Sequence, residues 1–403
     1  MSIAVAILGL ALLIFIHEVG HFGAALAVGM RPRGFSIGFG PPIAKVRRND
    51  IDYAFRAVPL GGYVTIPGMT RPQASDVDAF FGGAIRDTPE LVGPSERLKR
   101  ALAASDFDQA KAELETLVAA AEAHDVNGIK RGVRHVSDSL SEDAYWRQPI
   151  WKRIVAIAAG PATNLAFAVI VFAIVLVLVG GKATTTVEDV FDGTPAQEVG
   201  LLPGDRILEI DGARVTPEDV TDRIRGSGGG QLVLLVMRDG EQVTLGPVRP
   251  ELVEEGAIEV YRLGFQLGAE PLGFWEALSE APVLTLRLTG EIGKSLANIV
   301  REEGREQIAS PIGIVDESSA AAERGWESYL AVLAFISLSL GLLNLLPLLP
   351  LDGGHIVFAV VEKLRGRAIR REIYERVSAV GIALVLLLFF VGLTNDVGRL
   401  GGG

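Results

Sequence analysis

Four long apolar stretches separate the polar segments of this 403-residue chain. About 20 apolar residues are needed to cross the hydrocarbon core of a bilayer, and these stretches approach or exceed that length. The last one does so only if it begins near Val377. The pattern predicts an α-helical polytopic membrane protein with about four transmembrane helices, over Ile3–Val28, Ile154–Val179, Tyr329–Leu349 and Ile382–Leu393.

Composition supports a membrane protein and narrows its partners. Mean hydropathy is +0.34 and 49% of the residues are hydrophobic, a composition too hydrophobic for an ordinary soluble enzyme. The formal net charge of -11 argues against nucleic acid as a partner. The chain contains no cysteine, so disulfides and thiolate metal ligands play no part.

The first apolar stretch is interpreted as a retained span rather than a cleaved leader. It lacks a basic leading region and is too long for the apolar core of a signal peptide. It also carries His17, Glu18 and His21, which cleavage would discard.

Basic residues gather on one side of the four predicted spans. They follow the first span, precede the second, and separate the third from the fourth: Arg31, Arg33, Lys45, Arg47 and Arg48; Lys152 and Arg153; Lys363, Arg365, Arg367, Arg370 and Arg371. The positive-inside rule makes this side cytoplasmic. Both termini and the segment after the second span are therefore predicted to be extracytoplasmic.

The segment after the first span has the pattern of β-structure. Residues Gly34–Val64 alternate apolar and small residues around a polar turn at Arg47–Asp52, which predicts a β-hairpin. Its glycine-rich strands of low polarity can re-enter the membrane if other parts of the protein cover their edges. A hairpin on the membrane surface is the alternative. We assign the first span and this membrane-associated hairpin to one region, 1–69.

Two polar regions accompany the second span, which we assign to 148–181. Residues 70–147 form a cytoplasmic insert with a predicted amphipathic helix, Ser95–His124, in which Ser95 is the N-cap. Residues 269–327 are amphipathic and punctuated by polar side chains, so we expect surface helices at the outer face of the membrane.

Residues 182–268 change character to short alternating strands with Gly and Asp turns. The Gly204–Asp205 turn, the strand after it and the helical pattern of Thr216–Ser227 resemble an α+β PDZ domain. The sequence "YRLGFQLG" resembles the carboxylate-binding loop of such a domain, displaced to its end, with Leu263, Gly264 and Phe265 as candidates. A PDZ groove takes an extended chain by strand addition, so a peptide C-terminus is a predicted partner. A small β domain with a nonfunctional groove is the alternative.

Three groups that resist desolvation lie within the first apolar stretch. His17 and His21 are one helical turn apart on one face, about 6 Å along the axis, close enough to bind one ion. In the pattern H-E-x-x-H two neutral imidazoles bind zinc, while the glutamate, here Glu18, moves a proton from water to the leaving amine. An accidental match is the alternative. A charge at mid-membrane costs about 2.5 to 3.5 kcal/mol, so a glutamate there needs a functional explanation.

Two histidines leave a tetrahedral zinc site incomplete, so a third protein ligand is required. The candidates lie in the region of the last two spans, 328–403, where Pro347 and Pro350 remove backbone donors and unwind the helix. Asp352 is thereby held in irregular chain at membrane depth, where a carboxylate needs a cation. His355 is a competing ligand by chemistry alone, and we rank Asp352 above it.

Together these motifs resemble the site-2 protease family of intramembrane zinc metalloproteases. H-E-x-x-H in the first span, N-x-x-P-x-x-x-L-D-G far downstream and a single PDZ-like unit make the chain similar to the bacterial RseP-like branch. The resemblance implies that Zn²⁺ is the cofactor and that Glu18 is the catalytic base. It implies the zinc ligands His17, His21 and Asp352.

The same resemblance extends to two asparagines. The sequence "AGPATN", which ends at Asn164, is similar to the family's G-P-x-x-N element, and Asn344 begins the downstream motif. By that likeness Asn164 and Asn344 are candidates for contacting the unwound substrate backbone. Polar ties between helices are the alternative role for both.

The family implies an enzyme of the bacterial plasma (inner) membrane that cleaves within transmembrane segments of single-span membrane proteins. Trimmed anti-sigma factors and remnant signal peptides are the expected substrates, in regulated intramembrane proteolysis, and membrane lipid is a further partner. A noncatalytic membrane scaffold that binds peptide C-termini through its PDZ groove is the alternative. A transporter with a proton relay through His17 and Asp352 is disfavoured by the PDZ-like insert and the absence of repeat symmetry.

Overall fold

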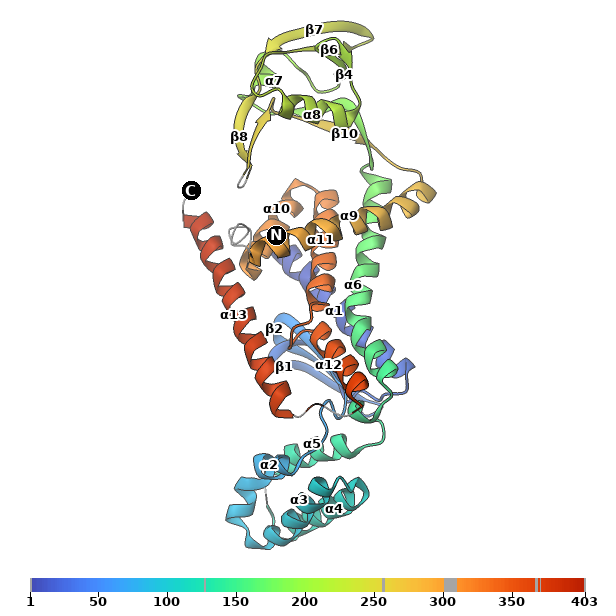
Figure 1. Cartoon of the computed structure of the whole chain (residues 1–403), viewed down its shortest axis with the longest axis vertical. Helices are drawn as coiled ribbons and strands as arrows, with labels where there is room; N and C mark the ends of the chain where they lie inside the picture. The colour runs from blue at the N-terminus through green and yellow to red at the C-terminus, as the bar shows by residue number, and fades with distance from the viewer. Residues whose placement is uncertain are drawn as a thin grey trace. The chain divides into compact units, whose positions relative to one another are not determined.

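The computed structural model describes residues 2–126, 128–255, 258–300, 310–366, 369 and 371–401. The chain divides into two compact units, one formed by Met1–Val169 and Thr285–Gly403, the other by Ile170–Leu284. Figure 1 labels most of the helices and strands of both. Arg367 and Arg370 of the predicted basic cluster, and positions 301–309 of the predicted surface segment, lie outside the described residues.

Four helices within the described residues are long and apolar enough to cross a membrane, as predicted. They are α1 (Ser2–Ala27), α6 (Ile150–Leu178), α11 (Trp326–Asn344) and α13 (Arg371–Gly401). α11 ends earlier than predicted, at Asn344 rather than Leu349, because Pro347 cannot donate the backbone hydrogen bond that would continue the helix. Large apolar side chains such as Leu8 and Phe390 are exposed on these helices, as lipid-facing positions require.

The predicted hairpin is present and more folded than the sequence pattern indicated. β1 (Gly34–Arg48) and β2 (Ile51–Thr65) are antiparallel and join at Asn49 and Asp50, both left-handed with φ of 50° and 61°. The start of β1, residues 34–37, pairs with 52–55 on one side and with 62–65 on the other. Both strands therefore bend back, and residues 62–65 form one edge of the resulting small sheet, to which no further described strand pairs. β2 packs beside α1 (Figure 1).

The insert contains several short helices: α2 (Ala74–Asp87), α3 (Val92–Ala104), α4 (Phe107–Ala123) and α5 (Lys130–Leu140). The prediction of one helix over Ser95–His124 was wrong. Ser105 adopts a left-handed conformation that ends α3, and Asp106 caps α4 by accepting a hydrogen bond from the Gln109 N–H, at 3.0 Å. Ser95 is not a cap: its hydroxyl donates to the Val92 carbonyl inside α3.

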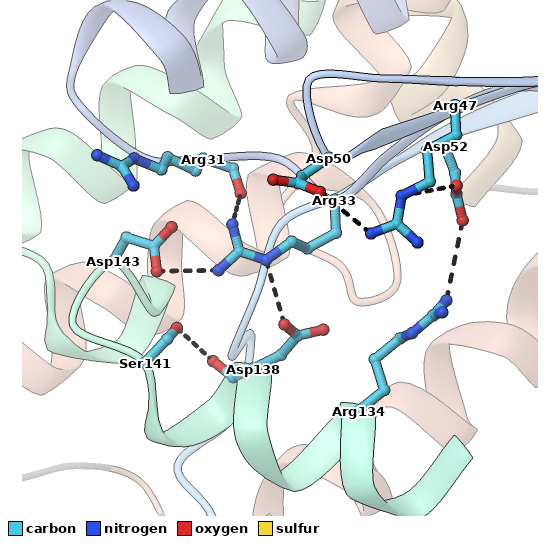
Figure 2. A network of polar contacts seen from close by, with 9 residues as sticks. All are labelled: Arg31, Arg33, Arg47, Asp50, Asp52, Arg134, Asp138, Ser141 and Asp143. Carbon is cyan, nitrogen blue, oxygen red and sulfur yellow. Dashed lines mark hydrogen bonds and ion pairs between the residues drawn. The ribbon is translucent and has the colours of Figure 1, made fainter. Parts of the chain in front are cut away.

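The insert has its own apolar core and is tied to the base of the hairpin. Phe81, Leu98 and Leu117 are buried in that core. Figure 2 shows Arg33, just before β1, with its Nε and Nη2 each 3.2 Å from a carboxylate oxygen, of Asp138 and Asp143 respectively. Each ion pair is partly exposed and contributes about 1 kcal/mol or less, so the network fixes position more than it adds stability.

Three further helices belong largely to the first unit. α10 (Pro311–Arg324) packs against α1 and α11. α12 (Asp352–Arg365) follows the irregular segment 345–351. α9 (Phe274–Val300) begins with two exposed aromatic side chains, Phe274 and Trp275, in the region where surface helices were predicted.

The second unit contains an antiparallel sheet with strand order β10-β3-β4-β6-β7, in which β10 is an edge. Its strands are β3 (Lys182–Val190), β4 (Arg206–Ile210) with the short β5 (Ala213–Arg214), β6 (Leu232–Arg238), β7 (Glu241–Val248) and β10 (Phe265–Glu270). Two helices, α7 (Pro195–Glu198) and α8 (Pro217–Gly226), and a hairpin of β8 (Glu251–Glu255) and β9 (Ile258–Arg262) complete it. Val220 and Ile224 of α8 share the sheet's buried core with Ile207 and Leu234.

A buried carboxylate holds one corner of this unit. Asp205 accepts hydrogen bonds from the Leu202 N–H at 2.9 Å and from Nε and Nη2 of Arg238 at 2.7 and 2.6 Å. Burial alone would raise the pKa of Asp205, but the Arg238 guanidinium and the Leu202 N–H bring it below its ordinary value. A lowered folded-state pKa contributes stability above the unfolded pKa of about 3.9, and that stability is lost as pH falls below it.

We therefore expect Asp205→Asn to destabilise the second unit at neutral pH by about 2 kcal/mol, because Arg238 and the Leu202 N–H lose their charged acceptor. The stability difference from the wild type should shrink as the pH is lowered below about 4. Thermal unfolding of the full chain, with proteolytic cleavage of the second unit as the readout, measures the stability loss at neutral pH and its decrease at low pH. Asp222→Asn on the exposed face of α8 is the control, and an equal loss there would contradict this role for Asp205.

Candidate metal centre

Three ligand atoms from distant parts of the chain converge within the first unit. His17 and His21, on one face of α1, are both buried, with their Nε2 atoms 3.1 Å apart. Asp352, the first residue of α12, places Oδ2 3.2 Å from Nε2 of His17 and 3.3 Å from Nε2 of His21. All three ligand atoms lie within 4.8 Å of one another.

This group has the properties of a zinc site. The Asp352 Oδ2 atom is buried and has no hydrogen-bond partner among the described residues, although it lies 3.2 and 3.3 Å from two imidazole nitrogens. Neutral imidazoles direct lone pairs inward, so these electron-rich atoms repel one another unless a cation lies between them. Two imidazoles and one carboxylate are a common donor set for catalytic zinc and leave a fourth position open. The residues present therefore fit zinc.

A contact from α6 orients one imidazole. Nδ1 of His21 lies 2.9 Å from the carbonyl oxygen of Ala156. A carbonyl only accepts, so Nδ1 carries the proton and Nε2 keeps its lone pair for the metal. The approach of α6 depends on Gly160, because a Cβ there would lie only 2.3 Å from Nε2 of His21.

The two candidates for the third ligand lie in different surroundings. Asp352 belongs to the only group of three or more metal-ligating side chains found within the described residues. His355, one turn further along α12, is outside that group, and its ring nitrogens lie 2.8 and 3.1 Å from the Tyr374 hydroxyl. The geometry therefore favours Asp352 over His355.

Glu18 is buried on α1 and faces the small sheet. The free edge of that sheet passes directly over it: a Cβ built on Gly62 would lie 2.7 Å from Cγ of Glu18 and 3.0 Å from the Ser36 carbonyl oxygen. The absence of a side chain at position 62 thus lets an unpaired strand edge approach the carboxylate. A chain that pairs with this edge would lie beside the Glu18 carboxylate.

The fit at position 62 gives a prediction. Gly62→Val should lower the proteolytic turnover that the family resemblance implies by about 100-fold, because Glu18 or the strand edge must shift by a substantial part of an ångström. The zinc content should not change, since the ligands are on other residues. Gly23→Ala, in α1 with Glu18 but with open space around its Cβ, is the control and should keep its activity. Full activity of Gly62→Val would show that the edge does not need this close approach.

The two asparagines are placed differently. Asn164 is fully buried one turn after Gly160, and neither polar atom of its side chain has a hydrogen-bond partner among the described residues. Asn344 donates from Nδ2 to the Leu340 carbonyl of its own helix, at 3.0 Å. An unsatisfied buried amide is costly, so of the two asparagines Asn164 has the side chain that is free to hydrogen-bond another group.

Sequence reasoning missed the glycines at positions 62 and 160 and an ion pair that joins α6 to α12. Arg153 donates to Glu362 at 2.6 Å, linking the helix that orients His21 to the helix that begins at Asp352. Gly160 lies within the quoted "AGPATN" motif, so the signal was present, but only the helix packing shows why a glycine is needed there.

Comparison with known proteins identifies the family. The family model described as Peptidase family M50 matches residues 5–388. The chain belongs to peptidase family M50. This confirms the predicted site-2 protease family, and the chain is a zinc-dependent metalloprotease embedded in a membrane. The scaffold and transporter interpretations are therefore not needed.

Full-length relatives carry consistent names. The chain is 29% identical to the zinc metalloprotease RasP of Bacillus licheniformis, over 96% of each chain. It is 28% identical to the regulator of sigma-W protease RasP of Bacillus subtilis, over 96% of each chain. A putative zinc metalloprotease of Rhizobium meliloti is 30% identical, over 98% of this chain and 95% of the relative.

Proposed function

We propose that this M50 peptidase hydrolyses peptide bonds within transmembrane segments of single-span membrane proteins. Zinc is held by His17, His21 and Asp352, and Glu18 is the general base. The observation that carries the proposal is the convergence of the three ligand atoms, from α1 and α12, next to a buried glutamate on a helix apolar enough to span a membrane.

The chain's own residues divide the chemistry among them. When bound, zinc supplies Lewis acidity that activates water near neutral pH and polarises a peptide carbonyl. Glu18 takes the proton from the attacking water and delivers it to the leaving nitrogen. Ala156 keeps His21 in the tautomer that binds metal, and the buried surroundings keep bulk water away from the polar groups.

A peptide bond inside a helix is hidden by its own hydrogen bonds, so the substrate must unwind before attack. We propose that the β1–β2 sheet is membrane-associated and that its 62–65 edge pairs with the unwound strand, presenting it to Glu18. The unsatisfied amide of Asn164 is suited to hold a substrate backbone group released by unwinding. Asn344 has the same proposed role, with its carbonyl oxygen as the contacting atom.

The proposed setting is the bacterial plasma membrane, with regulated intramembrane proteolysis as the process. The name of the Bacillus subtilis relative, regulator of sigma-W protease, supports substrates that control a sigma factor, such as a trimmed anti-sigma factor. Remnant signal peptides have the same single-span form. The proposed topology keeps the basic clusters cytoplasmic and both termini extracytoplasmic, and retains the regions 1–69, 70–147, 148–181, 182–268, 269–327 and 328–403.

We also propose that residues 182–268 are an extracytoplasmic PDZ domain that binds a peptide C-terminus. A cavity of about 390 Å³ runs between α8 and the edge strand β10, and Leu263, Gly264 and Phe265 line it. The Leu263 and Gly264 carbonyls accept hydrogen bonds from the N–H groups of Ala196 and Phe191. In a trans peptide the N–H points opposite to the carbonyl, so the N–H groups of Gly264 and Phe265 are directed away from those partners and suit a carboxylate.

Removing this unit tests its role. The Gly181 N–H donates to the Glu270 carbonyl at 3.1 Å, so the chain before residue 182 and the chain after residue 268 are adjacent and can be joined without stretching. Deletion of residues 182–268 should let the enzyme cleave untrimmed substrates at a rate approaching that of trimmed ones. Unchanged discrimination between the two substrates would refute the proposed selection role while leaving the catalytic proposal intact.

The catalytic proposal is tested by a reconstituted single-span reporter whose transmembrane segment carries a mass tag at each end. Products should end within the apolar segment when fragments are analysed by mass spectrometry. Cleavage only in the soluble flanks would contradict an intramembrane site.

A further inference from the structure

A second cavity, of about 550 Å³, lies in the first unit and is not used by the proposed reaction. Its wall is formed by the segment between β2 and α2, residues 145–149 with the start of α6, α12 from His355 to Lys363, and the start of α13. α6 and α13 are apolar enough to span a membrane and line the cavity with their first residues, so the cavity lies at helix ends, where headgroups would be found.

The cavity wall carries excess positive charge. Its charged residues are Arg71, Arg153, Glu362 and Lys363. Arg153 and Glu362 neutralise one another in the 2.6 Å ion pair. Within the described part of the chain, neither Arg71 nor Lys363 is paired with a carboxylate, so two cations face the cavity without a counterion.

Arg153 adds an unused donor. Its side chain is only 12% exposed, it lies over the Tyr145 ring at 4.7 Å, and its Nε–H has no hydrogen-bond partner among the described residues. A buried charged donor without an acceptor is destabilising, so an acceptor from outside the chain is expected. An oxyanion supplies both the acceptor and the missing negative charge.

The position of Arg71 is fixed by aromatic packing. Its guanidinium lies 5.1 Å from the ring centroid of Phe107 and 5.5 Å from that of Trp146. Arg147 contacts the same two rings, at 5.2 and 5.1 Å. Both guanidiniums pack on the same pair of rings, which orders Arg71 and places a second positive charge near the cavity.

The remaining lining distinguishes a lipid from a free anion. Met69, Ile150, Phe358 and Ile369 give the same cavity an apolar side. A free phosphate makes no use of apolar walls, whereas a phospholipid has a phosphate joined to glycerol and acyl chains. We propose that this cavity binds the headgroup of an anionic phospholipid, whose phosphate accepts hydrogen bonds from Arg71, Arg153 and Lys363.

The site has a structural consequence for the metal centre. Arg153 and Glu362 connect α6, which orients His21, to α12, which begins at Asp352. A phosphate on Arg153 adds a second anionic partner to that connection. The bound lipid thereby stabilises the arrangement of the two helices.

Calorimetric titration tests the site on the full chain, delipidated in a neutral detergent. Dihexanoyl phosphatidylglycerol is the probe, with dihexanoyl phosphatidylcholine and inorganic phosphate as separate arms. The phosphatidylglycerol should bind more tightly than either. Arg71→Gln combined with Lys363→Gln should weaken its binding by about 25-fold, at about fivefold for each cation removed.

The matched control is Arg31→Gln combined with Arg365→Gln. It also removes two positive charges, from residues of the basic clusters described above that do not line the cavity. We expect its affinity to stay within about twofold of the wild type, because a specific site does not sense diffuse surface charge. Thermal unfolding of both double variants verifies that they are folded.

Three results would overturn the proposal: no binding of phosphatidylglycerol, equal binding of inorganic phosphate, or an equal loss in the two double variants. The second would indicate a free-anion site and the third general attraction to the basic surface. Because the readout is binding and not proteolysis, these results do not depend on the proposed catalytic function.

Discussion

Glu18→Gln should abolish intramembrane cleavage while leaving zinc bound. The amide keeps the shape of the side chain in its buried position, but it cannot accept a proton from water. Loss of a general base typically lowers turnover by about 100- to 10,000-fold. Zinc content by atomic emission and single-turnover cleavage of the reporter, measured on the same preparation, separate the two properties.

The control for this variant is Glu323→Gln. Glu323, on α10, is also a glutamate close to α1. It accepts a hydrogen bond from Ser2 at the start of α1, several turns before His17 and His21. It should have wild-type turnover. If Glu18→Gln cleaved at the wild-type rate, another group would have to be the base, and the assignment of Glu18 would be wrong.

Asp352→Ala should lose both zinc and activity. The substitution removes one of the three converging atoms and leaves only two imidazoles, both on α1. Loss of an outer-shell partner alone costs about 10- to 100-fold in metal affinity, and loss of a ligand should cost more. Zinc retained after dialysis against a chelator of graded concentration gives the affinity directly.

His355→Ala is the comparison that decides between the two candidate ligands. His355 lies on the same helix, hydrogen-bonded to Tyr374 and outside the ligand group. It should retain zinc in full. The opposite result, with zinc lost from His355→Ala and kept by Asp352→Ala, would reverse the assignment.

Much of the membrane architecture was predictable because hydropathy acts locally. An uninterrupted apolar stretch of sufficient length specifies a span whatever its neighbours do, so α1, α6 and α11 follow from composition. The same holds for the Glu18 region, where the cost of placing a carboxylate among apolar residues is enough to indicate a functional site from the amino-acid sequence alone.

What could not be predicted depends on contacts between distant segments. Alternating residues indicated the strands of the hairpin, but not that residues 34–37 pair on both sides and leave 62–65 as an edge over Glu18. In the insert, the apolar stripe continues past Ser105 in the sequence. Only the left-handed backbone of Ser105, with Asp106 as the next N-cap, shows that the helix is broken there.

The choice of third ligand had the same limit. Asp352 and His355 are both chemically able to bind zinc, and the unwinding at Pro347 brings both into the same region. Only the start of α12 beside α1 distinguishes them, because it places the Asp352 carboxylate at hydrogen-bonding distance from both imidazoles.

Zinc K-edge X-ray absorption of the purified wild-type protein tests most directly whether two distant segments bind one ion. We expect a four-coordinate spectrum with two imidazole ligands at about 2.0 Å and oxygen ligands at about 2.0 to 2.2 Å, and little zinc absorption from Asp352→Ala purified in the same way. A spectrum with three imidazoles, or one unchanged by Asp352→Ala, would contradict the account.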